Sequence, residues 1–319
     1  MINIKDKIDC DNNDSIFKIS IRKHESFEIR RGWLHKGIRY VDSGNSFSDK
    51  DSDKNVGDKL GIGRSMVKAL RYWLKAAKLI IDKNNKQYLT SIGKIINEKD
   101  TYFEEKGTNY LIHYLLASNC DDATAWYWFF NVYKELYIDK ETFVEEFIEF
   151  IGQQKSKRII EDEYNCIIKS YSHKSIDSID PEETKICPLS ELNLIQSLDN
   201  KGKIYKKTSP NIDDVHPMIA YAVVMDQLND ESKITKFTNK KNNITQLEIN
   251  KLWKDENSIG KIFNLDRISI FRIIEKLENI GVIDIVRTAG LDIINIKKQM
   301  TLEQCLEEYY KMILEASHG

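Results

Sequence analysis

The sequence predicts a mainly α-helical protein with small β wings, in which two winged helix-turn-helix modules are joined by a helical middle region. Apolar residues recur at helical spacing along most of the chain, and only four prolines interrupt it. The order helix, short turn, helix and two short strands occurs twice. At 319 residues, the chain has room for two or three modules of ordinary size.

These patterns divide the chain into five consecutive segments. Residues 16–20 alternate apolar and polar side chains, which predicts a short strand leading into the first motif. The segments are an N-terminal strand and motif region (1–53), a first winged helix-turn-helix (54–99), a helical middle region (100–246) with a linker near 172–184, a second winged helix-turn-helix (247–300) and a C-terminal helix (301–319).

Composition favours a soluble globular protein of the cytoplasm. The chain is 41% hydrophobic and 31% charged, and its net charge of −2 argues against uniform coating of a polyanion. The N-terminus lacks the apolar core of a signal peptide, and the longest apolar run, residues 218–225, is too short to span a bilayer. Its five scattered cysteines form no C-x-x-C pair, which is typical of reduced thiols.

Charge is distributed unevenly between neighbouring segments. Residues 54–99 contain eleven Lys and Arg against three Asp and Glu, whereas residues 100–150 contain three basic and eleven acidic side chains. The first segment could therefore face a polyanion while the second repels it, which would orient a nucleic acid on the surface.

The clearest element is LGIGRSMVKALRYWLKAAKLI, residues 60–80. A short helix is expected to end near Leu60, followed by a glycine turn and a second helix from about Arg64. Two short strands around Asn84 and Asn85 would form a wing. Ser65 lies near the second helix's start, and five cations fall within an arc of about 80° on it: Arg64, Lys68, Arg71, Lys75 and Lys78. This face predicts DNA binding, and the alternative is a solvated basic surface.

Residues 257–296 repeat this layout. A helix at 258–263, a turn at 264–266 and a second helix at 267–279 precede Gly281, and two strands then flank Ala289 and Gly290. The local charge is nearly balanced, so this module could pack against protein or bind DNA.

The middle region is predicted to be helical and aromatic. Five consecutive aromatic residues at 126–130 could stack on bases, but a helix points them all around its axis, which favours burial. His113 lies within YLIHYLL and is expected in a core. Further helices are predicted at 155–176, 187–195, 216–228 and 301–316.

Four motifs in order resemble those of the SspB-like family, which is found beside bacterial DNA phosphorothioation genes. They are HESFEIRRGWLHKG, LGIGRSMVKALRYWLKAAKLI, TAWYWFFN and ICPLSELNLI, and the resemblance covers residues 17–296. Ser26 stands where the family's motif leads us to expect Thr. The resemblance implies a DNA-nicking component of a phage-defence system that works with a cysteine desulfurase, an ATPase and an ATP-pyrophosphatase-like enzyme.

Under this resemblance, HESFEIRRGWLHKG (24–37) becomes a candidate nicking site. Phosphodiester cleavage needs a metal ligand or proton acceptor together with cations that stabilise phosphate charge. Glu25 could hold Mg²⁺ or Mn²⁺ and His24 could act as acid or base, while the phosphate would be bound by Arg30, Arg31 and Lys36. The alternative is a structural role, with Glu25 paired to Arg30 or Arg31 above a buried Trp33.

Three functions therefore compete: a metal-dependent DNA nickase, a non-catalytic DNA-binding adaptor that recruits the sulfur-transfer and ATPase partners, and a protein whose winged helices bind only proteins. A homodimer and a partner complex are both compatible with the pattern. The sequence contains no Walker loop, nucleophile elbow or HExxH motif, which disfavours an independent ATPase, esterase or zinc hydrolase.

Overall fold

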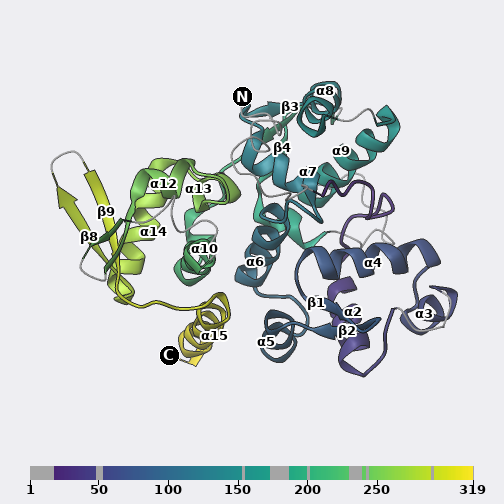
Figure 1. The fold of residues 1–319 in the computed structure, drawn as a ribbon, viewed down its shortest axis with the longest axis horizontal. Coiled ribbons are helices and arrows are strands. Elements are labelled where there is room, and N and C mark those ends of the chain that lie inside the picture. Colours follow the sequence, from purple (N-terminus) through teal and green to yellow (C-terminus); the bar gives the residue numbers. More distant parts are fainter. Residues whose placement is uncertain are drawn as a thin grey trace. The chain divides into compact units, whose positions relative to one another are not determined.

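The computed structural model describes residues 18–47, 53–152, 155–172, 187–199, 202–229, 239–241, 244–288 and 291–318. These residues are mostly helical, with small antiparallel sheets, as predicted (Figure 1). Contacts divide the chain into two units, each built from two segments. Unit 1 contains residues 1–90 and 115–208, and unit 2 contains residues 91–114 and 209–319. The five consecutive segments proposed from the sequence stay a prediction.

The first part of unit 1 has the predicted order of helix, turn, helix and hairpin. Gly61 ends the helix preceding the turn with φ +66°, a conformation that glycine adopts without strain. Asn84 and Asn85 both have positive φ and close a two-residue hairpin. The elements are α2 (Trp33–Asp42), α3 (Asp53–Leu60), α4 (Arg64–Ala76), β1 (Ile80–Lys83) and β2 (Lys86–Leu89).

The rest of unit 1 is built around the aromatic run. Residues 126–130 are at most 4% exposed, so the prediction that they are buried is confirmed. Trp128 packs against Phe143 and Phe147 at centroid distances of 5.0 and 5.1 Å. The elements are α7 (Thr124–Tyr127), the π-helix η1 (Trp128–Val132), β3 (Tyr137–Ile138), α8 (Lys140–Ile151), α9 (Lys157–Tyr171), the 3₁₀-helix η3 (Pro188–Leu192), β4 (Ile195–Ser197) and β5 (Tyr205–Lys207), with sheet order β3-β5-β4.

Two local predictions in unit 1 were wrong. Residues 18–20 form no strand, because the Ser20 amide donates to the Thr124 hydroxyl (2.9 Å) instead of to a neighbouring strand; residues 16–17 lie outside the described part. A short helix with a proline near its start was predicted at 187–195, and it forms as a 3₁₀-helix over Pro188–Leu192; its extension to residue 195 was wrong, because Asn193 (φ +54°) ends it and β4 follows. Nearly all of the predicted linker at 172–184 lies outside the described residues.

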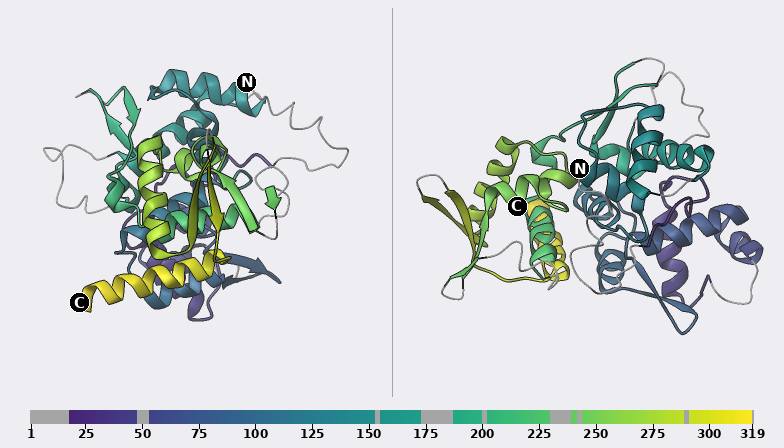
Figure 2. Two further views of the ribbon diagram at one scale, coloured as in Figure 1. Left: turned by 90° about the vertical axis from the view of Figure 1, so that its left-hand side faces the viewer. Right: turned by 45° about the horizontal axis from the view of Figure 1, so that its top comes forward.

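Unit 2 surrounds the apolar helix α10 (Pro217–Asn229), which packs against α14 and α15 (Figure 2). Helix α14 (Arg267–Ile280) begins at Asp266, whose side chain accepts a hydrogen bond from the Ser269 amide (2.7 Å), and ends at Gly281. The predicted turn at 289–290 lies outside the described residues. The other elements are α5 (Ser91–Lys99), most of α6 (Lys106–Ala117), η4 (Ile212–Asp214), β6 (Asn239–Lys241), β7 (Ile244–Glu248), α12 (Ile249–Lys254), α13 (Ile259–Ile262), β8 (Ile283–Thr288), β9 (Leu291–Ile296) and α15 (Leu302–His318).

Two further predictions are confirmed. His113 is fully buried, its Nε2 lies 2.7 Å from the Ile262 carbonyl oxygen, and burial lowers its pKa to about 4. The four cysteines within the described residues, Cys120, Cys166, Cys187 and Cys305, form no disulfide bond. None of the described helices combines the length and apolar character needed to cross a bilayer.

Candidate nucleic-acid interface

Helix α4 has one buried face and one exposed face. Val67, Leu70, Trp73 and Leu74 are at most 1% exposed and attach the helix to unit 1. On the other face Arg64, Ser65 and Lys68 are exposed, while Arg71 and Lys75 are half-exposed. This arrangement leaves the cations of the N-terminal half of α4 available for an anionic ligand.

Asp82 of strand β1 divides the cations of α4 into two groups. Its carboxylate forms an ion pair with Lys75 and lies 3.9 Å from Arg71, and Gln87 donates a hydrogen bond to it (2.6 Å). Burial alone would raise the pKa of Asp82, but these partners outweigh burial and lower it. Within the described residues, Arg64 and Lys68 form no ion pair with an acid.

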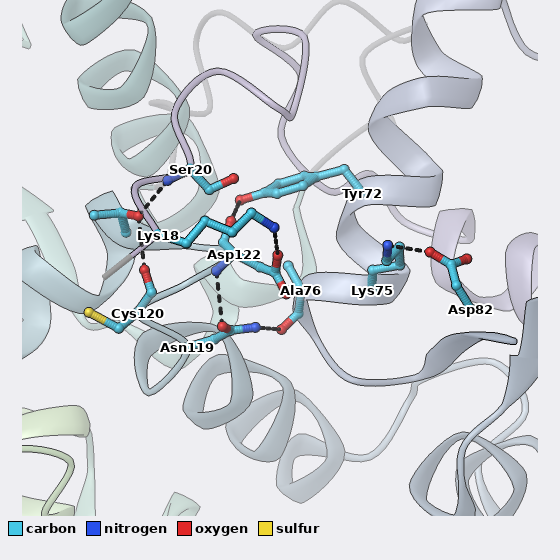
Figure 3. Close-up of polar contacts among 10 residues, drawn as sticks. Lys18, Ser20, Tyr72, Lys75, Ala76, Asp82, Asn119, Cys120 and Asp122 are labelled. Carbon is cyan, nitrogen blue, oxygen red and sulfur yellow. Dashed lines mark hydrogen bonds and ion pairs between the residues drawn. The ribbon is translucent and has the colours of Figure 1, made fainter. Parts of the chain in front are cut away.

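The C-terminal half of α4 is fixed by polar contacts (Figure 3). The Asn119 side chain donates to the Ala76 carbonyl (3.0 Å), and the Tyr72 hydroxyl donates to the Asp122 carbonyl (2.9 Å). The Asp122 carboxylate also lies 3.6 Å from the Lys18 ammonium. Helix α4 is therefore a rigid support for its exposed side chains.

Two of the predicted cations lie outside this helix face. Lys78 follows the end of α4 at φ +53°, so its side chain belongs to the turn that leads into β1. Lys36 of α2 donates from its ammonium to the Leu60 carbonyl (3.2 Å) at the end of α3. Both side chains are exposed, but neither continues the row of Arg64 and Lys68.

His24 is a buried link between the first motif and helix α9. Its Nε2 lies 3.1 Å from Glu163 Oε1, both side chains are at most 3% exposed, and the same oxygen accepts a hydrogen bond from the Arg22 amide. The imidazole stacks on Trp73 at a centroid distance of 5.8 Å. Burial acts to lower the pKa of His24, but the neighbouring Cys166 and Glu163 outweigh it and raise this pKa well above its usual value.

The Ser26 amide donates to His24 Nδ1 over 3.1 Å. This hydrogen bond needs an unprotonated Nδ1, so it opposes the electrostatic effect of Glu163, and protonation of the ring must break it. His24 therefore holds the loop by both of its ring nitrogens, one directed to α9 and one to the loop's own backbone.

Glu25 is exposed, in a loop where Arg22, Glu25 and Ser26 all have positive φ. The ion pair of Glu25 with Arg30 or Arg31, which the structural alternative expects, is not formed. The Arg30 guanidinium lies over the Phe27 and Trp33 rings at 5.4 and 5.3 Å, and Arg31 forms an ion pair with Glu191.

The described residues do not fit a preassembled metal site. Nowhere in this part of the chain do three His, Cys, Asp or Glu side chains gather so that they could hold an ion. Glu25 offers a single carboxylate at the surface, whereas Mg²⁺ and Mn²⁺ sites in nucleases usually need several oxygen ligands. We therefore derive no chemical step through a metal.

Comparison with known proteins gives the family. A family model described as "Protein of unknown function (DUF4007)" matches residues 21–310. The chain belongs to the DUF4007 family. This DUF4007 chain also shares its fold with two solved structures, a magnesium ion-bound SspB and a second SspB structure. No curated protein matches the chain.

Both SspB structures are 20% identical to this DUF4007 chain with a TM-score of 0.71, and each comparison covers 93% of the chain. The matches cover 97% of the magnesium ion-bound protein and 87% of the other. The likeness establishes a common fold, and it confirms the SspB-like resemblance that four sequence motifs indicated.

The structure of this DUF4007 protein thus separates the predicted site residues into groups. Arg64, Ser65 and Lys68 share one exposed face, but Glu25 and His24 point to different environments, one exposed and one buried. Sequence reasoning missed Asp82 and Glu163. Asp82 is the only acid between residues 59 and 97 and could have been suspected of pairing with α4, whereas nothing local in the sequence indicates Glu163.

Proposed function

We propose that this DUF4007 protein is the DNA-binding component of a bacterial phosphorothioation system. In this proposal α3, α4 and the β1–β2 hairpin form a winged helix-turn-helix, with α4 as the recognition helix. The order of these elements and the SspB-like resemblance support it. The observation that carries the proposal is the exposure of Arg64 and Lys68, which have no acidic partner among the described residues.

The position of these cations suits duplex DNA. In helix-turn-helix proteins the N-terminal residues of the second helix reach base edges, and neighbouring cations bind phosphate. Arg64, Ser65 and Lys68 occupy the first two turns of α4. Arg71 and Lys75 would have to share or leave Asp82 in order to bind phosphate, so we expect them to contribute less to affinity.

We place an adaptor role ahead of nicking. An SspB protein of the same fold was crystallised with magnesium, but here Glu25 would need further ligands that the described residues do not gather around it. Recruitment of a cysteine desulfurase, an ATPase and an ATP-pyrophosphatase-like enzyme is part of the same proposal. Incubation with supercoiled plasmid and Mg²⁺ or Mn²⁺, with an EDTA control, distinguishes the two roles, because only a nickase relaxes the plasmid.

DNA binding is tested by reversing the two free cations. Arg64→Glu with Lys68→Glu should weaken binding to a labelled 30-base-pair duplex by at least about tenfold and reduce the salt dependence, because two phosphate contacts become repulsive. Fluorescence anisotropy between about 50 and 200 mM salt measures both quantities.

The matched control is Lys157→Glu with Arg158→Glu on α9, which makes the same charge change at two exposed positions of unit 1. If the folded α4 variant binds with the affinity and salt dependence of this control, α4 is not the DNA-binding helix. Circular dichroism checks that both variants keep their helical content.

A further inference from the structure

The outer face of the β1–β2 hairpin carries an apolar pair and two lysines. Ile81 pairs with Tyr88 and Lys83 with Lys86, and because strand side chains alternate, these four residues share one face. All four are exposed, with 43% of Ile81 and 49% of Tyr88 accessible to solvent. We call them the wing face.

The opposite face of the hairpin is packed against unit 1. Asp82 contacts Lys75 and Arg71 of α4, and the buried Gln87 lies 2.7 Å from the Ser46 hydroxyl. The hairpin is thus fixed beside the C-terminal half of the basic face of α4. The wing face therefore adjoins the surface that we propose for DNA.

The composition of the wing face indicates an anionic ligand with an apolar component. The Ile81–Tyr88 pair leaves close to half of its surface open to solvent, and neither Lys83 nor Lys86 forms an ion pair within the described residues. The segment that contains them, residues 54–99, carries eleven cations and three acids. Apolar side chains flanked by cations suit a kinked minor groove, where the cations bind phosphate and the apolar groups contact unstacked bases.

We propose that the wing face is a wedge for duplex DNA. The proposal rests on the proposed function and extends it to the kind of DNA that is bound. Ile81 and Tyr88 would insert at one base step of the minor groove and open its stacking, while Lys83 and Lys86 bind the flanking phosphates. Such a wedge favours duplexes whose step is already unstacked or easily kinked, since there the deformation costs less.

The experiment compares two labelled 30-base-pair duplexes that differ only in a central two-nucleotide bulge. The wild-type protein should bind the bulged duplex at least about tenfold more tightly, because the cost of unstacking has already been met. Ile81→Ser with Tyr88→Ser should abolish this preference, while Tyr88→Phe retains the ring and should keep it.

A second variant separates charge from insertion. Lys83→Ser with Lys86→Ser should weaken binding to both duplexes by the same factor and reduce the salt slope by about two, leaving the preference for the bulge unchanged. Arg64→Glu with Lys68→Glu should weaken both duplexes as well.

The other possible results contradict either the wedge proposal or the DNA-binding proposal. Tight wild-type binding without preference for the bulge, or a preference that survives Ile81→Ser with Tyr88→Ser, overturns the wedge and leaves the DNA-binding proposal standing. If that apolar variant binds both duplexes as the wild type does, Ile81 and Tyr88 make no contribution to DNA binding. Failure of the wild type to bind either duplex overturns the DNA-binding proposal and the wedge together.

Discussion

Glu163→Ala is expected to destabilise unit 1 more than any surface substitution. The Glu163 carboxylate is almost fully buried, accepts a hydrogen bond from the Arg22 amide and lies 3.1 Å from His24 Nε2. Removing it leaves the Arg22 amide without its acceptor and removes a buried anion beside His24. Breaking such a pair from one side costs about 3 to 5 kcal/mol in the free energy of unfolding.

Glu163→Gln separates the charge from the hydrogen bonds. The amide oxygen of Gln can still accept from the Arg22 amide, so this variant should lose only the contribution of the negative charge, about 1 to 2 kcal/mol. The expected order of stability is wild type, Glu163→Gln, Glu163→Ala. Urea unfolding monitored by tryptophan fluorescence measures it, since His24 packs on Trp73 and Trp126.

Asp162→Ala is the matched control, because Asp162 is the preceding residue of α9 and pairs with Arg22 at 3.0 Å. The Arg22 side chain is 45% exposed, so solvent screens this pair and its loss should cost less than about 1 kcal/mol. Two results would refute the conclusion that Glu163 holds the loop containing His24 against α9. One is equal destabilisation by Asp162→Ala and Glu163→Ala, and the other is a loss of under about 1 kcal/mol for Glu163→Ala.

Two further predictions concern buried cations and bases. The pKa of His113 in the folded protein is about 4, below that of the unfolded chain, so the unfolded state gains a proton first as pH falls. Stability should therefore drop by up to about 3 kcal/mol between pH 6.5 and 4, and His113→Gln should remove this part of the pH dependence in urea titrations. The Lys207 ammonium donates to the carbonyl of Phe129, inside the π-helix, and to that of Tyr133, which follows its last residue. Lys207→Met should lower the unfolding free energy by roughly 1 to 3 kcal/mol for each carbonyl left without a donor, whereas Lys206→Met on the same strand should change it little.

Much of the helical architecture could be predicted because it is encoded locally. Helix α14 begins after Asp266 and stops at Gly281, and both boundaries follow from residues that favour helix ends. The hairpin at Asn84 and Asn85 is equally local, since both residues tolerate the positive φ that a two-residue turn needs. The early end of the helix predicted at 187–195 is also local, because Asn193 at φ +54° stops it after five residues.

The candidate site could be predicted only in part, because its electrostatics depend on residues far apart in the chain. His24 has a catalytic residue type in a charged motif, but its partner Glu163 lies 139 positions away, so the local sequence could not indicate the buried contact between them. Similarly, helical spacing placed Arg71 and Lys75 on one face with Arg64 and Lys68. The packing of the hairpin, however, brings Asp82 beside Arg71 and Lys75 only. Periodicity indicates which side chains share a face but not which of their charges are compensated.

The helix, turn, helix and hairpin order occurs in two modules, and they differ in how many of their cations are paired with acids. This difference affects what each module could bind. On α4, Arg64 and Lys68 are exposed without an acidic partner among the described residues, and the nearby hairpin adds Lys83 and Lys86.

In the C-terminal module, Arg267 lies 3.8 Å from Asp292, Lys276 lies 2.8 Å from Asp213 and Arg287 lies 3.9 Å from Glu275. A phosphate that binds one of these three cations competes with an acid of the protein, which reduces the gain from releasing counterions. At the start of α14, Ile268 is 67% exposed, an apolar side chain that suits a protein surface better than a phosphate backbone. The same order of elements is therefore compatible with a DNA-binding module at one place in the chain and a protein-facing module at the other, and the pairing of charges favours that division.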